Sequence, residues 1–161
     1  MPSVLHLKAE GQTLKIPAFC GLYHYNKLVL EYGKAYSLCG HSGSEKSQYL
    51  KALANIAPAT YNGREVQFDG MEIYYLNRIS ADFLDQNITG FIDILKIIPQ
   101  EPNQLILLDE IFMSVETEAF IELCKQLENY ARTYKSIIIV VDHRFCLPTQ
   151  LDIHDLLSEK L

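Results

Sequence analysis

The sequence lacks several features that would place it in a specialised class. It has four cysteines and no Cys-x-x-Cys pair, so neither a zinc site nor a disulfide framework is expected. No apolar run approaches the roughly 18 residues of a membrane-spanning helix, and the first residues lack the basic start of a signal peptide. The net charge of -6 argues against sequence-independent binding to nucleic acid. These absences predict a cytoplasmic protein with no nucleic-acid partner and no direct membrane insertion.

The chain does have enough apolar residues for a core of its own. It contains 161 residues, of which 48% are hydrophobic, and it shows no linker and no internal repeat, so we expect a single domain over residues 1–161. The spacing of apolar residues and the positions of turn-forming residues predict its secondary-structure elements. These are strands through residues 1–39 with a turn at Glu10 and Gly11, a hairpin or strand over 63–73, and an amphipathic helix over 114–134. Residues 91–98 fit a short helix or a buried strand, and the short helix is preferred.

Three apolar runs predict the centre of a sheet. They cover residues 35–39, 105–108 and 136–141, and none of them alternates between apolar and polar side chains. Strands that are apolar on both faces are typical of a parallel sheet with both faces covered. We therefore expect an α/β fold with a mainly parallel sheet flanked by helices and an antiparallel β portion at the N-terminus.

A phosphate-binding loop with one departure follows the first of these runs. The pattern GxxxxGKS would place glycine where the chain has Glu45. In such a loop the backbone N–H groups and the start of the next helix, here predicted over 48–56, point at phosphates. Glu45 adds a side chain and a negative charge to the same place, so it must swing outward or weaken binding. The loop residues are Gly40, His41, Ser42, Gly43, Ser44, Glu45, Lys46 and Ser47, and Gln48 follows them.

Each polar residue near the predicted strand ends has a role in this hypothesis. Lys46 would reach the outer phosphates, and Ser47 and Asp109 would hold Mg²⁺. Glu110 would polarise a water aimed at the γ-phosphate. His143 would donate a hydrogen bond to that phosphate. The alternative is structural: an acidic turn exposed to solvent after the second strand, and an exposed histidine after the third.

Together these motifs resemble the nucleotide-binding domain of the ATP-binding cassette family, most closely its exporter branch. Residues 27–34 are similar to the amphipathic strand and turn before the family's phosphate loop. Residues 62–70 are similar to its GxVxxDG hairpin. The resemblance implies a P-loop fold that binds ATP or ADP with Mg²⁺, with Glu110 as the catalytic glutamate and His143, followed by Arg144, as the switch histidine.

The chain also departs from the family's pattern. Ala81 stands where the family has the glutamine of its glutamine loop, and Ile111 replaces a proline. No LSGGQ signature occurs, and the stretch between Lys46 and Asp109 is too short for the helical subdomain that carries it. Gln48 replaces a hydroxyl residue. The resemblance therefore implies weak hydrolysis or none, unless a partner supplies the signature loop.

Two function classes remain open on the sequence. The first is a nucleotide-binding protein that works as a homodimer or with a heteromeric partner of the same family. The second is a pseudo-ATPase whose fold survives as a protein–protein interaction module. A small-molecule kinase with a P-loop is weaker, because Glu110 and His143 argue against it. Phe19, Tyr23 and Tyr25 are candidates for an adenine-stacking aromatic, but core packing is the preferred role for each.

Overall fold

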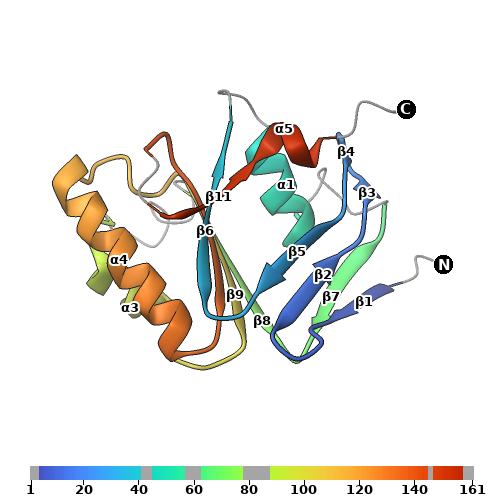
Figure 1. Cartoon of the computed structure of the whole chain (residues 1–161), viewed down its shortest axis with the longest axis horizontal. Helices are drawn as coiled ribbons and strands as arrows, with labels where there is room; N and C mark the ends of the chain where they lie inside the picture. The colour runs from blue at the N-terminus through green and yellow to red at the C-terminus, as the bar shows by residue number, and fades with distance from the viewer. Residues whose placement is uncertain (1–3, 41–44, 57–62, 78–87, 145–146, 158–161) are drawn as a thin grey trace.

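The structure is a computed structural model that describes residues 4–40, 45–56, 63–77, 88–144 and 147–157. Short strands make up the N-terminal part of the described chain, and helices occur between strands only from α1 onward (Figure 1). In chain order they are β1 (Val4–Lys8), β2 (Thr13–Ile16), β3 (Phe19–Cys20), β4 (His24–Tyr25), β5 (Leu28–Glu31), β6 (Lys34–Cys39), α1 (Glu45–Leu53), β7 (Glu65–Asp69), β8 (Glu72–Asn77), α3 (Phe91–Ile97), β9 (Gln104–Asp109), α4 (Thr117–Thr133), β10 (Ile137–Val141), β11 (Thr149–Asp152) and α5 (Ile153–Leu156).

The centre of the fold is a five-stranded sheet in the order β11-β6-β10-β9-β8. Every neighbouring pair in it is parallel. All residues of β9 and β10 are buried, as expected for strands covered on both faces. The prediction of a mixed α/β fold with a parallel sheet flanked by helices is confirmed.

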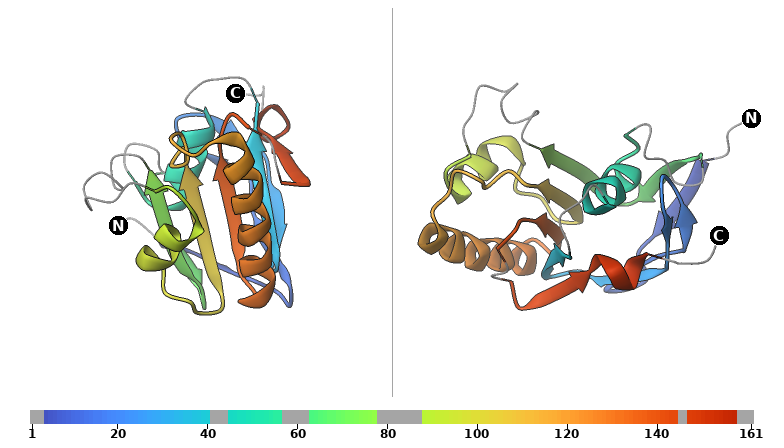
Figure 2. Two further views of the ribbon diagram at one scale, coloured as in Figure 1. Left: turned by 90° about the vertical axis from the view of Figure 1, so that its left-hand side faces the viewer. Right: turned by 90° about the horizontal axis from the view of Figure 1, so that it is seen from above.

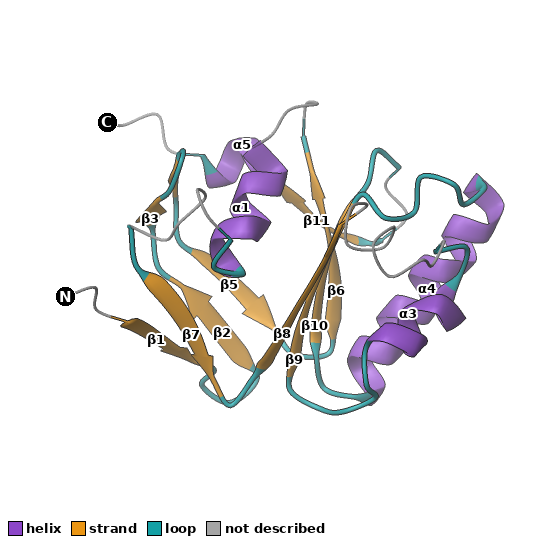
Figure 3. Ribbon diagram, turned by 180° about the vertical axis from the view of Figure 1, so that it is seen from behind, coloured by secondary structure: helices purple, strands orange, loops and turns teal. Residues whose placement is uncertain are grey.

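Helices and smaller sheets cover the two faces of this sheet (Figures 1 and 3). Helices α3 and α4 lie on one face, and α1 with the short N-terminal strands lies on the other, as the view from above also shows (Figure 2). Side chains alternate between the two hydrophobic clusters along β9, so Leu105 and Leu107 join the cluster with α1. Ile106 and Leu108 join the cluster with α4.

The helices form where apolar side chains recur at helical spacing. Helix α4 buries one stripe of side chains, and it begins three residues later than the predicted range of 114–134. Helix α3 confirms the short helix predicted over 91–98. Helix α1 begins at Glu45 rather than at residue 48, because Lys46 extends the buried stripe of Tyr49, Leu50 and Leu53 toward the N-terminus. The end of the phosphate-binding motif is therefore the first turn of a helix.

The N-terminal strands confirm the expected antiparallel portion, with one correction nearby. Strands β2 and β5 pair antiparallel, as do β3 and β4, and the turn at Gly11 is present. Of the hairpin or strand predicted over residues 63–73, the strand is confirmed and the hairpin is not. Strand β7 pairs with β1, and β8 pairs with β9, so the turn at Gly70 carries the chain from one sheet to another. Residue 62 lies outside the described residues.

The described cysteines differ in their exposure to solvent. Cys124 is buried in the core, whereas Cys20 is exposed, and Cys146 lies outside the described residues. Within the described ranges no group of three or more His, Cys, Asp and Glu side chains is arranged to hold a metal ion. A search of the same residues for a helix that is both long and apolar enough to cross a membrane finds none.

Candidate functional site

The candidate site lies at the edge of the sheet where the parallel strands end. Gly40 follows β6, Asp109 ends β9, and His143 follows β10, which lies between the other two strands. Val141 and Asp109 are register partners, so β9 and β10 end at the same level. Open α/β sheets bind their ligands at this edge. The tertiary structure thus brings the sequence-predicted residues to one place, while residues 41–44 of the predicted loop lie outside the described residues.

Gly40 is required where the chain leaves the sheet. Its φ is +139°, a backbone conformation that side chains disfavour. An added Cβ would also lie 2.2 Å from Cγ2 of Ile153 in α5. The C-terminal helix therefore packs directly against the entry to the phosphate-binding motif.

The first turn of α1 positions the lysine and the serine of the motif. Lys46 is buried, with 8% of its surface exposed, and its Nζ donates a hydrogen bond of 3.1 Å to the carbonyl oxygen of Gly40. Tyr25 supports the same turn, since its hydroxyl donates to the carbonyl of Glu45 at 3.2 Å. Tyr25 and Phe19 are buried in the core, which confirms their predicted packing role. Tyr23 is half-buried against the same cluster.

Asp109 is bound through both of its carboxylate oxygens. The hydroxyl of Ser47 donates to Oδ1 at 3.0 Å, and the hydroxyl of Tyr75 donates to Oδ2 at 2.6 Å. Side-chain alternation along β9 directs Asp109 to the face that α1 covers, because Leu105 and Leu107 face the same way. Asp109 is only 5% exposed, so these two bonds satisfy a buried charge.

Sequence reasoning missed two residues next to Asp109, both on β8. Burial raises the pKa of Tyr75, and the hydrogen bond to Asp109 raises it further, so the hydroxyl keeps its proton and acts as a donor. Asn77 ends β8 as the register partner of Asp109 and bonds to the side chain of Tyr75. The sequence signal that could have identified Asn77 is its position as a polar residue at the end of a strand. Ala81, the position assigned to the glutamine loop, lies outside the described residues.

Glu110 and His143 are placed differently from Lys46 and Ser47. Glu110 is exposed and has a φ of +55°, while its backbone N–H donates to the carbonyl of Val141 at 2.9 Å. A left-handed residue that is neither glycine nor asparagine is uncommon, and such conformations cluster at functional sites. The His143 side chain is 64% exposed, and its Nδ1 lies 3.3 Å from Oδ1 of Asp142.

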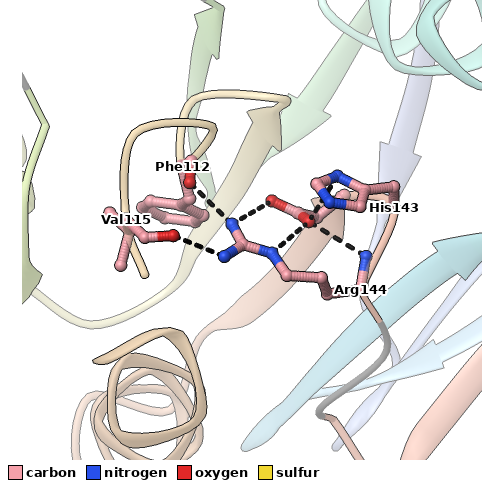
Figure 4. A network of polar contacts seen from close by, with 5 residues as sticks. Phe112, Val115, His143 and Arg144 are labelled. Atoms are coloured by element: carbon pink, nitrogen blue, oxygen red, sulfur yellow. Dashed lines mark hydrogen bonds and ion pairs between the residues drawn. The ribbon is translucent and has the colours of Figure 1, made fainter. Parts of the chain in front are cut away.

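An arginine just after the histidine holds the neighbouring loop in place (Figure 4). Arg144 Nε donates to Asp142 Oδ1 at 3.0 Å, and its two terminal nitrogens donate to the carbonyl oxygens of Val115 and Phe112. Its guanidinium also lies over the ring of Phe120, 4.1 Å from the centroid. The loop that begins at Glu110 is thereby tied to the end of β10.

The remaining predicted binding residues are Glu45 and Gln48. Glu45 is the first residue of α1, so its carboxylate stands where the helix dipole already favours negative charge. The Oε1 of Gln48 is buried and accepts no hydrogen bond from the part of the chain that the structure describes. Glu45 therefore offers the helix start a negative charge of its own in the place where a phosphate would lie.

Comparison of the chain with models of known protein families and with curated proteins gives no match.

The groups at this edge include donors that would suit a phosphate and oxygens that would suit a metal ion. The backbone start of α1 and Lys46 offer positive charge and hydrogen-bond donors, which phosphates accept. Mg²⁺ prefers oxygen ligands, and Ser47 and Asp109 have them. Both oxygens of Asp109, however, already accept hydrogen bonds from protein hydroxyls. Each carboxylate oxygen has a second lone pair, so Asp109 keeps acceptor positions that a metal-bound water could use.

Proposed function

We propose that this protein binds a nucleotide, ATP or ADP, by its phosphates at the carboxyl edge of the sheet, in a fold of the P-loop type. One observation carries the proposal: the hydroxyl of Ser47 bonds to Asp109 at 3.0 Å, next to the buried Lys46 in the same helical turn. These residues are far apart in sequence, and the fold brings them to the place where α/β sheets bind phosphates. The resemblance to the ATP-binding cassette family supports the same function.

The buried lysine is positioned to receive a phosphate. In the structure its Nζ is bonded to the carbonyl of Gly40, which is a neutral partner. A phosphate oxygen would be a stronger acceptor, because hydrogen bonds between charged groups are about twice as strong as neutral ones. We infer that Lys46 exchanges the carbonyl for a phosphate, and that the N–H groups at the start of α1 donate to the same ligand.

Hydrolysis is expected to be slow or absent. Glu110 and His143, the two proposed catalytic residues, are both exposed. An exposed carboxylate and imidazole are not preorganised around a reacting phosphate, and preorganised groups supply most of the rate in such reactions. A homodimeric or heteromeric partner that covers this edge would be needed to complete the site. We propose such a partner for this protein, together with a location in the cytoplasm.

The pseudo-ATPase alternative has an observation of its own. Glu45 places a carboxylate on the first turn of α1, where it complements the helix dipole and repels a phosphate. If that effect dominates, the fold binds no nucleotide and acts through its surface. The two functions differ in one measurable property, which is saturable nucleotide binding.

Calorimetric titration with ATP and ADP tests the proposal directly. We expect Lys46→Ala to weaken binding at least tenfold, since a hydrogen bond to a charged group contributes about 1.5–3 kcal/mol. Lys51→Ala is the matched control, because Lys51 lies in the last turn of the same helix. No binding at millimolar ATP would leave the interaction module as the function, and equal affinity in wild type and Lys46→Ala would exclude the phosphate loop as the binding site.

Substitution of Glu45 provides a second variant, for which we expect the opposite effect on nucleotide affinity. Glu45→Gln removes the charge and keeps the side chain's size and helix propensity. We expect binding to tighten about two- to fivefold, because a charge at a helix terminus is worth about 0.3–1 kcal/mol. Glu118→Gln, in the first turn of α4, is the control and should leave the affinity unchanged. Weaker binding in Glu45→Gln would mean that the carboxylate contributes to the ligand site.

A further inference from the structure

Strands β3 and β4 place a cysteine and a histidine side by side near the surface. The Sγ of Cys20 lies 2.9 Å from the Nδ1 of His24, and Cys20 is exposed while His24 is partly buried. The proposed nucleotide-binding function uses neither residue. A thiol within hydrogen-bond reach of an imidazole is an arrangement that activates cysteine as a nucleophile, because the ring can accept the proton of the thiol.

The pairing of the two strands holds these side chains together. Cys20 and His24 are register partners, and the neighbouring register pair is Phe19 and Tyr25. Since side chains alternate along a strand, the first pair faces outward and the second, which is buried, faces the core. The rings of Phe19 and Tyr25 lie 4.8 Å apart, and the ring of Tyr25 lies 4.9 Å from that of Tyr49 in α1. The backbone that carries the thiol and the imidazole is therefore anchored from below by packed aromatic rings.

The other described cysteines lie in surroundings that disfavour reaction. The thiol of Cys39 donates to the carbonyl oxygen of Leu151 at 3.2 Å, and a carbonyl oxygen does not take the proton away. Burial raises the pKa of the Cys39 thiol, and the negative charge of Asp152 raises it further. Cys124 is 1% exposed in the cluster that contains α4, so a dissolved reagent does not reach it. Among the described cysteines, Cys20 is the exposed one, and it has a base beside it.

We propose that Cys20 is a modification site, a reactive thiol that His24 activates for exchange with low-molecular-weight disulfides such as glutathione disulfide. His24 takes the proton of the thiol, and the thiolate attacks one sulfur of the disulfide. The new S–S bond forms as the old one breaks, and the departing thiolate takes the proton from the imidazolium. The Cys20 sulfur is thereby oxidised to a mixed disulfide, and one glutathione leaves in its reduced form.

The size of the expected effect follows from the amount of thiolate. An ordinary thiol is only a few per cent thiolate at neutral pH, so transfer of its proton to a base raises the concentration of nucleophile about thirtyfold at most. A thiolate that is stabilised by its surroundings is also less nucleophilic, which offsets part of this gain. We therefore expect exchange at Cys20 to be about tenfold faster than at an ordinary exposed thiol.

The first measurement compares the four cysteines of the wild-type chain in their reaction with glutathione disulfide at neutral pH. A lysine or arginine lies between each cysteine and the next, so trypsin separates all four into different peptides. Mass spectrometry of these peptides gives the rate of mixed-disulfide formation at each cysteine. We expect Cys20 to react at least about tenfold faster than Cys39 and Cys124. A rate at Cys20 no higher than that at Cys39 would overturn the inference.

Replacement of the histidine tests its role as the base. In His24→Gln the side chain does not take the proton, so exchange at Cys20 should slow about tenfold at neutral pH. At about pH 9.5 an ordinary thiol is itself mostly ionised, so the rates in the two proteins should then agree within about twofold. His6→Gln is the matched control, because His6 bonds to Asp69 in another sheet, and it should leave the rate unchanged. Equal rates in wild type and His24→Gln at neutral pH, or a gap that persists at high pH, would contradict the proposed role of His24.

A second measurement needs no histidine variant and therefore does not depend on the folding of His24→Gln. The ultraviolet absorbance of thiolate is compared between wild type and Cys20→Ser at neutral pH. We expect a difference of about a third of one thiolate per chain or more, against a few per cent for an ordinary thiol. A difference of only a few per cent would show that the proton stays on sulfur, and the inference would be wrong. Neither measurement involves a nucleotide, so the inference and the proposed function stand or fail separately.

Discussion

The two halves of the carboxyl edge are built differently. In the half formed by α1, β8 and β9, the proposed functional side chains are themselves part of the buried hydrogen-bond network, as the Ser47–Asp109–Tyr75 chain shows. In the half formed by the ends of β9 and β10, the hydrogen bonds are made by residues next to the proposed catalytic residues, and not by the catalytic residues themselves. There the buried Asp142 is bonded to the partly buried Arg144, while Glu110 and His143 are exposed.

In our proposal this difference separates the residues for binding from those for catalysis. A ligand on the first half meets groups that are already ordered, so little conformational entropy is lost on binding. A ligand on the second half meets exposed side chains on a backbone that is firmly anchored. In our proposal a partner would bring the exposed side chains on this backbone into position. Without that partner we expect this half to contribute little to catalysis.

The largest effect on stability is expected from substitution of Arg144, whose guanidinium holds the loop in the second half of the edge. Arg144→Met removes every side-chain hydrogen bond of the guanidinium and leaves the Asp142 carboxylate, 1% exposed, with fewer donors. Removing one partner of a buried ion pair costs about 3–5 kcal/mol. Urea denaturation should show that loss in the free energy of unfolding. The control is Arg132→Met at an exposed position on α4, which should change the free energy of unfolding by less than about 1 kcal/mol.

A double variant sharpens this prediction. Asp142→Asn combined with Arg144→Met removes the buried charge together with its partner, so the loss should be smaller than the sum of the two single losses. A purely additive result would mean that the guanidinium stabilises the loop through Phe112, Val115 and Phe120 and not through Asp142.

A smaller loss is expected at the entry to the first half. Gly40→Ala places a methyl group against Ile153 at a φ of +139°, so both packing and backbone conformation oppose it. We expect a loss of about 2 kcal/mol in thermal or urea unfolding. Gly90→Ala is the control, because its Cβ would meet no atom within 4 Å and its φ is -174°. Equal stability of the two variants would show that α5 does not constrain the motif.

The smallest effects are expected at the two exposed residues. His143→Gln and Glu110→Gln should each change stability by no more than about 0.5 kcal/mol, because surface substitutions have little effect. They should also leave ATP affinity within about twofold of wild type, since the first half alone binds the phosphates in our proposal. A loss of ATP affinity in either variant would mean that the second half is part of the binding site. The proposed difference between the two halves would then be wrong.

Periodicity and apolar runs predicted much of the fold, for identifiable reasons. Strands β9 and β10 are buried on both faces, so their sequences are continuous apolar runs. Helix α4 buries one stripe, which leaves a helical period that the sequence shows. Over residues 63–73 the sequence left a hairpin or a strand open, and strands form there without a hairpin, because a turn signal shows only that the chain bends. It does not show which strands pair, and β7 pairs with β1, distant in sequence.

The candidate site was predicted in part as well. Lys46, Ser47 and Asp109 were expected together from the phosphate-loop pattern and the strand-end rule, and the Ser47–Asp109 bond joins them. Tyr75 was missed, because one tyrosine among ten carries no local signal of its partner. Arg144 was noted only as the residue after the histidine, and its role as a loop anchor depends on contacts with residues of another segment.

By itself the sequence determined which segments become strands and helices, and which polar residues stand at the ends of the strands, because these features depend on neighbours along the chain. Only the tertiary structure decided how those ends combine. The strand order places β10 between β6 and β9, and the register of β8 on β9 brings the hydroxyl of Tyr75 to Asp109. Pairing of parallel strands joins residues that are distant in sequence, so the hydrogen bonds that define this site have no local signature.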